Sequence, residues 1–239
     1  MKAKIFLIAL CFTITGAMFA QETKDKWDFP VKPGTEEWRK LKSYEARVKA
    51  CQVPEEILLS LSTNELTDIC LEYPLLYDIF AFNNRNKGIN KFFDNFNGIR
   101  ELYKRKDAAN ELLNRYDLKL QQISFVEGNA SDYEKGGYTI SISILEMLLC
   151  FTDTQGDIQK KILQKLVSGY ENKLLYTDYF KGLGLQCNFY SRAHIVTKIL
   201  QQNNEQSPIK DGSLVLTSGR TNSETVDILN KLSYQLIKE

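Results

Sequence analysis

The sequence is poor in histidine, in net charge and in long apolar runs. Histidine occurs once, as His194, which leaves no basis for a histidine-rich metal site. The 31 basic residues nearly balance the 30 acidic ones, so no net field steers the chain onto nucleic acid or an anionic membrane. Beyond the N-terminal segment, no stretch approaches the roughly 18 consecutive apolar residues of a membrane span. We therefore expect neither a nucleic-acid partner nor a membrane-spanning helix in the processed chain.

Motifs that hold phosphates or activate nucleophiles are also missing. The sequence has no P-loop, no dinucleotide-binding glycine pattern after a strand, and no nucleophile elbow around Ser191. His194 could act as a base for Ser191, three residues away, or for Cys187, but a histidine on a helix surface or half-buried is the simpler interpretation. The acids Glu65, Asp68 and Glu72 fall on one helix face, which a solvated polar surface explains. We predict no catalytic residue, no metal ligand and no cofactor.

A short basic segment is also better explained as solvated surface than as a binding site. Arg100, Lys104, Arg105 and Lys106 lie close together in the sequence, but Glu101 and Asp107 interleave them. Such mixed charges are typical of a solvated helix surface rather than of a binding site.

The first twenty residues have the pattern of a secretory signal peptide. Lys2 and Lys4 precede an apolar run from 5 to 15, and a small residue, Ala20, is followed at once by polar residues. The run is too short for a permanent membrane helix. We expect cleavage after Ala20 and a mature protein in the periplasm or outside the cell.

Four cysteines would remain after cleavage, namely Cys51, Cys70, Cys150 and Cys187. An oxidising compartment allows three pairings among them, and the sequence does not choose one. Each lies in an apolar context, where cysteine behaves as a small buried hydrophobe. We favour buried free thiols over disulfides, because a domain of this size has a core large enough to be stable without cross-links.

Residues 21–34 mix aromatic residues, prolines and charges, which predicts an extended lead-in whose aromatic side chains pack on the domain. Residues 35–239 then carry repeated helical signals. Thr35 has the features of an N-cap, Ser62 and Glu65 form a capping box, and apolar residues recur three and four positions apart. Residues 127–137 contain three glycines and predict a surface loop, a possible boundary within the domain.

Residues 139–151 fit both periodicities: isoleucines alternate as in a strand, and leucines follow at helical spacing. Because no partner strand is evident, we expect a buried helix there. The whole pattern predicts an all-α fold of about ten short helices, each too short to be stable alone. Two architectures satisfy this requirement, an irregular array and an α-solenoid of the HEAT or armadillo kind.

Residues 35–117 resemble a helical module found in secreted proteins of Gram-negative bacteria. The resemblance rests on six segments: 36–38 (Glu-Glu-Trp), 62–63 (Ser-Thr), 70–75 (Cys-Leu-Glu-Tyr-Pro-Leu), 81–84 (Ala-Phe-Asn-Asn), 96–98 (Phe-Asn-Gly) and 105–108 (Arg-Lys-Asp-Ala). The module has no activity to transfer, so the resemblance implies export and a helical fold.

Aromatic residues between 80 and 96 suggest where a partner binds. Phe82 falls outside the stripe of Ile79 and Phe80, so we predict that Phe82, Asn83 and Asn84 line a concave binding surface. The sequence therefore favours an exported, non-enzymatic interaction module for a protein or cell-envelope partner. A small-ligand carrier with an apolar cavity and an enzyme using scattered carboxylates are the alternatives. Partner identity and oligomeric state stay open.

Overall fold

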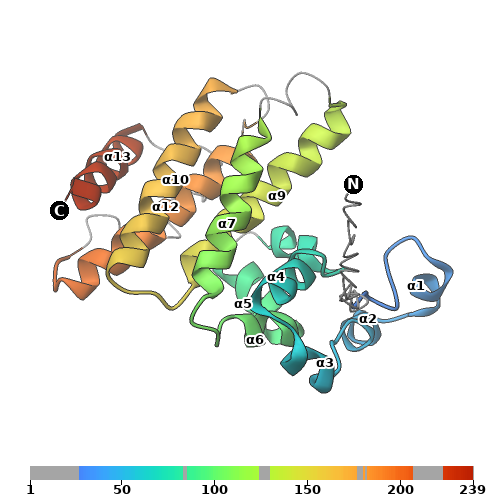
Figure 1. Ribbon diagram of the computed structural model, residues 1–239. Coiled ribbons are helices and arrows are strands. Elements are labelled where there is room, and N and C mark those ends of the chain that lie inside the picture. Colours follow the sequence, from blue (N-terminus) through green and yellow to red (C-terminus); the bar gives the residue numbers. More distant parts are fainter. Residues whose placement is uncertain are drawn as a thin grey trace, which may run out of the picture.

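The computed structural model describes residues 27–82, 85–123, 130–176, 180, 182–206 and 223–238 (Figure 1). These residues form an all-α fold of eleven α-helices and one 3-10 helix, with no strand among them. The elements are α1 (Glu36–Lys40), α2 (Tyr44–Ala50), α3 (Glu55–Ser60), α4 (Thr63–Leu71), η1 (Leu76–Ala81), α5 (Arg85–Asn95), α6 (Asn97–Leu102), α7 (Ala108–Gln121), α9 (Asp132–Phe151), α10 (Asp157–Leu175), α12 (Leu183–Gln202) and α13 (Ser223–Lys238).

The elements from α1 to α6 are short and surround an aromatic cluster. This cluster consists of Phe29, Tyr73, Phe92 and Phe96, all buried. Phe29 comes from the lead-in, and its ring centroid lies 6.0 Å from those of both Tyr73 and Phe96. The expectation that aromatic side chains of residues 21–34 pack on the domain is confirmed for Phe29.

The longer helices α7, α9, α10 and α12 pack together as a four-helix bundle, which α13 covers on the side of α10 and α12 (Figure 1). Helices α9 and α12 run in the same direction, because Asn188, early in α12, contacts Glu146, late in α9, and Lys198, near the end of α12, contacts the Thr152 carbonyl just after α9. The contacts of α9 with α12 and of α10 with α13 each pass over one helix in the sequence, and stacked helical hairpins of a solenoid make such contacts too.

Helix α7 belongs to both halves of the molecule. On one side its Arg115 forms an ion pair of 2.8 Å with Asp68 of α4. On the other side its Asp117 forms an ion pair of 2.8 Å with Lys165 of α10. The short-helix half and the bundle therefore share one packed element.

The prediction of a loop through residue 137 is wrong for its second part, because α9 already begins at Asp132. Ser131 accepts a hydrogen bond from the Glu134 backbone, and the Glu134 carboxylate accepts one from the Ser131 backbone, so a capping box starts the helix. Gly136 and Gly137 lie on the exposed side, where they are tolerated. The buried helix expected over 139–151 is confirmed as the rest of α9.

All four cysteines of the described chain are free and buried, as favoured from the sequence. Burial raises the pKa of the Cys51 thiol to about 11, and it raises the pKa values of Cys70 and Cys150 as well. The thiols are therefore protonated at neutral pH and unreactive in the folded state.

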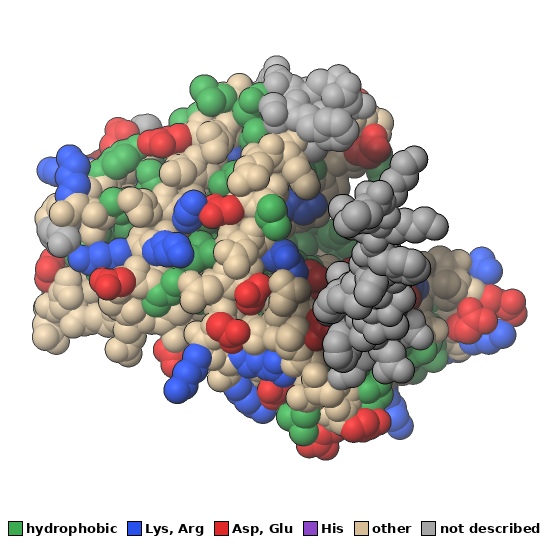
Figure 2. Space-filling model, in the orientation of Figure 1, with side chains coloured by type: hydrophobic (Ala, Val, Ile, Leu, Met, Phe, Trp, Pro, Cys, Tyr) green, Lys and Arg blue, Asp and Glu red, His purple; other side chains and the backbone are tan. Residues whose placement is uncertain are grey.

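Residues 1–20, the expected signal peptide, lie outside the described residues. Within the described ranges, none of the helices combines the length and the apolarity that crossing a membrane requires. Acidic and basic side chains lie side by side across the face drawn in Figure 2, which is the distribution that the near-neutral composition suggests.

Candidate functional site: a polar notch beside the 3-10 helix

The predicted binding residues fall where η1 meets α5. Phe82 is the C-cap of η1 and is half-buried, whereas Asn83 and Asn84 lie outside the described residues. The two elements on either side of these residues, together with α2, form a small polar notch. Its polar side chains are Tyr44, Tyr73, Asp78, Lys91 and Asn95.

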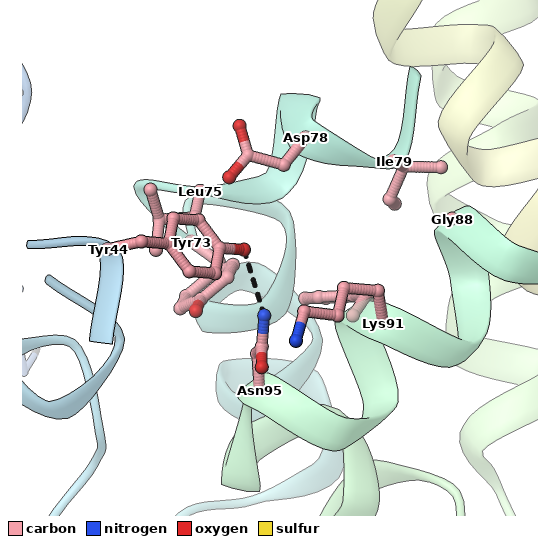
Figure 3. A pocket seen from close by; sticks show the side chains of 9 residues that line it. Tyr44, Tyr73, Leu75, Asp78, Ile79, Gly88, Lys91 and Asn95 are labelled. Atoms are coloured by element: carbon pink, nitrogen blue, oxygen red, sulfur yellow. Dashed lines mark hydrogen bonds between the residues drawn. The ribbon is translucent and has the colours of Figure 1, made fainter. Parts of the chain in front are cut away.

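A glycine makes the notch possible. A Cβ atom on Gly88 of α5 would lie 2.2 Å from the carbonyl oxygen of Ile79 in η1, so only glycine allows the two elements to pack this closely. The close approach brings Asp78 of η1 opposite Lys91 and Asn95 of α5 (Figure 3).

The notch holds a mixed set of hydrogen-bonding groups. Asn95 donates a hydrogen bond of 2.8 Å from its Nδ2 to the hydroxyl of Tyr44 (Figure 3). The Lys91 ammonium lies 5.9 Å from the centroid of the Tyr44 ring. Tyr73 is only 3% exposed, and its hydroxyl has no hydrogen-bond partner within the described part of the chain. A buried hydroxyl without a partner is uncommon and points to a bound water or to a group supplied from outside.

Burial and a nearby carboxylate keep both phenols protonated. Desolvation is the main cause that raises the pKa of Tyr44, and the charge of Asp78 adds to it. Desolvation likewise raises the pKa of Tyr73. Both hydroxyls can therefore donate hydrogen bonds at neutral pH.

The cavity inside the notch has a volume of about 10 Å³, which is room for about one water molecule. A substrate does not fit, although an acid, an amine and two phenols lie close together. The arrangement suits hydrogen-bond recognition of one polar group at a surface, with displacement of one water.

A second polar cluster lies in the centre of the bundle. We call it the buried ion-pair network: Glu146 of α9, Lys173 of α10, Tyr116 of α7 and Asn188 of α12. Lys173 Nζ lies 2.7 Å from both carboxylate oxygens of Glu146, and both side chains are fully buried. Tyr116 and Asn188 each donate to Glu146 Oε1, at 2.7 and 2.8 Å.

This network satisfies most of its own polar groups. Lys173 also donates to the Gly184 carbonyl, at 3.0 Å. Gly169 makes room for it, because a Cβ atom there would lie 1.8 Å from the Tyr116 hydroxyl. With both charges inaccessible, the network ties four helices together rather than meeting a ligand. Sequence analysis did not identify any of its members.

The other residues that the sequence analysis considered for catalysis or metal binding do not form a site. His194 is half-buried on α12 and stacks on Phe151 with ring centroids 4.9 Å apart. Ser191 and Cys187, the nucleophiles that it could serve, are fully buried. The three acids of α4 have different roles: Glu65 belongs to the capping box, Asp68 pairs with Arg115, and Glu72 is exposed.

Comparison of the chain with family models, with curated proteins and with solved structures finds no match. The resemblance of residues 35–117 to a module of secreted Gram-negative proteins therefore stays a prediction.

Proposed function

We propose that the chain is an exported, non-enzymatic interaction module that holds a protein partner at the notch. The observation that carries the proposal is the Tyr73 hydroxyl, which is buried and lacks a partner within the described residues while it lines a notch with room for one water. A carbonyl or carboxylate of a partner would accept from Tyr73, and Lys91 would add a positive charge beside it.

The size of the hollows supports surface binding over a small-ligand carrier. An apolar groove lies between η1 and α9, lined by Leu76, Ile144 and Leu145, and has a volume of about 170 Å³. Pockets that enclose drug-sized ligands have volumes of roughly 300–1,000 Å³. The described groove is smaller than that range, whereas a protein partner needs only a contact surface with a few anchoring positions.

Site-specific photo-crosslinking in the producing cell tests the proposal. A photoreactive amino acid replaces Phe82, at the C-terminal end of η1, and in a second variant it replaces Leu175, which is 76% exposed at the end of α10. We expect a discrete protein adduct from position 82 and none of the same mass from position 175.

The dependence on the notch is tested in the same cells. The pair Tyr73→Phe and Lys91→Gln removes the donor hydroxyl and the positive charge; added to the position-82 variant, it should reduce the adduct at least about tenfold, the loss of about 1.4 kcal/mol of binding. The matched control, Lys87→Gln, removes the same charge from α5 outside the notch and should leave the adduct intact. Equal adducts from both crosslinking positions, or an adduct indifferent to the notch variants, would overturn the proposal.

A further inference from the structure

Helix α13 is less deeply embedded than the two helices on which it packs. Its buried residues in the described chain are Leu229, Ser233 and Leu236, whereas α10 buries seven residues and α12 buries twelve. It lies at the edge of the bundle, against α10 and α12 (Figure 1). Because few apolar side chains hold α13 in place, it can leave the bundle at a lower cost in free energy than either neighbour.

The buried stripe of α13 has a polar centre. Leu229, Ser233 and Leu236 recur four and three positions apart, so they share one helix face. A serine therefore stands where an amphipathic helix ordinarily carries an apolar residue. Opposite it on α12 lies Arg192, which is only 1% exposed and donates from Nη2 to Asn230 at 2.6 Å and to Ser233 at 3.4 Å. Polar groups of α13 thus face a buried cation.

The guanidinium of Arg192 is poorly satisfied under α13. Its Nε and Nη1 have no hydrogen-bond partner among the described residues, and it forms no ion pair with any of them. The Tyr170 ring of α10 lies against it, with the ring centroid 4.8 Å from Cζ. Burial lowers the pKa of Arg192 to about 10, so the side chain is still charged at neutral pH. A buried charge without a counter-ion is destabilising, which weakens the docking of the helix that covers it.

The carboxylates nearest to Arg192 are already engaged. Glu171 of α10 accepts a hydrogen bond from the Tyr234 hydroxyl of α13, and Glu146 belongs to the buried ion-pair network. Both attract the guanidinium, but neither forms an ion pair with it. The amide of Asn230 offers it one accepting oxygen, whereas a carboxylate would offer two and a negative charge. An acid at this position would therefore satisfy Arg192 better than α13 does.

We propose that α13 is a displaceable helix, and that the face of α10 and α12 which it covers binds an amphipathic helix of a partner protein. The partner helix carries apolar residues in the places of Leu229 and Leu236 and a carboxylate in the place of Asn230. That carboxylate pairs with Arg192 through charge-assisted hydrogen bonds that α13 does not supply. Docking of one helix against others is a recurrent mode of recognition. Helix α13 then competes for this face and excludes helices that lack the acid.

Amide hydrogen exchange of the full mature chain tests whether α13 leaves on its own. We expect the central amides of α13 to exchange at least about tenfold faster than those of α12, through local opening. Asn230→Asp supplies the missing carboxylate and should slow the exchange of α13 about tenfold. Gln235→Glu makes the same amide-to-acid change at an exposed position of this helix and should alter exchange less than about twofold. Equal protection of α13 and α12, or equal effects of the two variants, would overturn the proposal.

A labelled peptide tests the covered face as a binding site on the same chain. The probe has the sequence of residues 223–238 with Asn230→Asp, and the matched control peptide carries Gln235→Glu instead. In fluorescence anisotropy the probe should bind at least about tenfold more tightly than the control, and it should speed the exchange of α13, because it displaces that helix. Equal affinities would indicate exchange of α13 between copies of this chain and would refute the proposal. So would a probe that does not saturate below about 1 mM or that leaves the exchange of α13 unchanged.

A change at Arg192 tests the counter-ion. Arg192→Met removes the charge and keeps a long side chain, so the chain should bind the probe and the control peptide equally. A preference for the acidic probe that survives this change would contradict the pairing. A circular dichroism melt checks the fold of the variant, and if it does not fold, the comparison of positions 230 and 235 still decides. None of these results depends on Tyr73 or Lys91, so this proposal and the one for the notch can fail separately.

Discussion

Between α1 and α6 the helices have five to eleven residues, whereas α7, α9, α10, α12 and α13 have 14 to 20. The two halves also bury different side chains. In the short-helix half the hydroxyls of the buried Thr63 and Thr67 each find an acceptor, whereas the buried Tyr73 hydroxyl has none within the described residues. Every charged side chain that is buried in the described chain, namely Glu146, Lys173 and Arg192, belongs to the bundle.

The difference shows what helix length permits. The helices α1, α2 and α3 bury at most one residue each, and the buried residues of α4 and α6 are uncharged. A buried charge needs several donors or acceptors around it to offset its desolvation. The bundle surrounds Glu146 with donors from three other helices. The short-helix half is therefore held by apolar packing, and the bundle additionally by a polar network whose members depend on one another.

Separating the buried charges should have the largest effect. Glu146→Gln or Lys173→Met alone leaves the other charge buried without its partner, and each should lower the free energy of unfolding by about 3–5 kcal/mol. The matched control in the short-helix half is Leu102→Met, a volume-conserving change of a buried residue, which should lower it by less than about 1.5 kcal/mol. Equilibrium unfolding in urea measures all three variants.

The double variant Glu146→Gln with Lys173→Met sharpens this result. It removes both charges. It should therefore lower the free energy of unfolding by about 2 kcal/mol less than the two single variants together. If the losses of unfolding free energy add up, or if the single variants are as mild as Leu102→Met, the proposed difference between the two halves is wrong.

Gly169→Ala should have an intermediate effect. The added methyl group would overlap the Tyr116 hydroxyl and push it away from Glu146, which should lower stability by about 1–3 kcal/mol. Tyr116→Phe in the same chain removes the overlapping atom and should recover part of the loss. Gly136→Ala on the exposed side of α9 meets no atom within 4 Å and should raise stability by about 0.5–1 kcal/mol. Thermal and urea unfolding compare the four chains, and equal effects of the two glycine changes would contradict the packing of Tyr116.

The smallest effect concerns the thiols, a feature that both halves share. The pKa of Cys51 is raised by burial to about 11 in the folded chain, above its ordinary value near 9. Its stabilising contribution is therefore complete below pH 9 and is lost as the pH rises toward 11, by about 1 kcal/mol between pH 9 and 10.

Comparing variants isolates this contribution. Cys51→Ala should show a shallower decline of unfolding free energy between pH 9 and 10 than the unchanged chain, and Cys150→Ala in the bundle should show the same, because burial raises both pKa values. A slope unaffected by Cys51→Ala would mean that the thiol is solvated in the folded state.

Periodicity and capping were sufficient to predict most of the helices. Phe189, Ala193, Val196 and Leu200 recur three and four positions apart in the sequence, and all four are buried in α12. The capping box of Ser62 and Glu65 starts α4 as expected. These signals are local, because one turn of helix determines which residues share a face.

The remaining features depend on contacts between distant residues. Glu146 interrupts an apolar run, which is a visible signal, but its partner Lys173 lies on another helix, where nothing in the neighbouring sequence marks it as buried. Gly88 and Gly169 resemble any other helical glycine in the sequence, and only their neighbours in space explain them. Tyr73 continues the helical spacing of Leu66, Ile69 and Cys70 and is buried with them. That its hydroxyl lies beside Asp78 without a partner in the described residues could not be inferred from spacing.

The position of α7 has a consequence for unfolding. Because its ion pairs reach α4 on one side and α10 on the other, neither half can lose this helix without weakening its neighbour. Opening of the aromatic half should propagate to the bundle, and a protease should find no stable fragment that ends between the two.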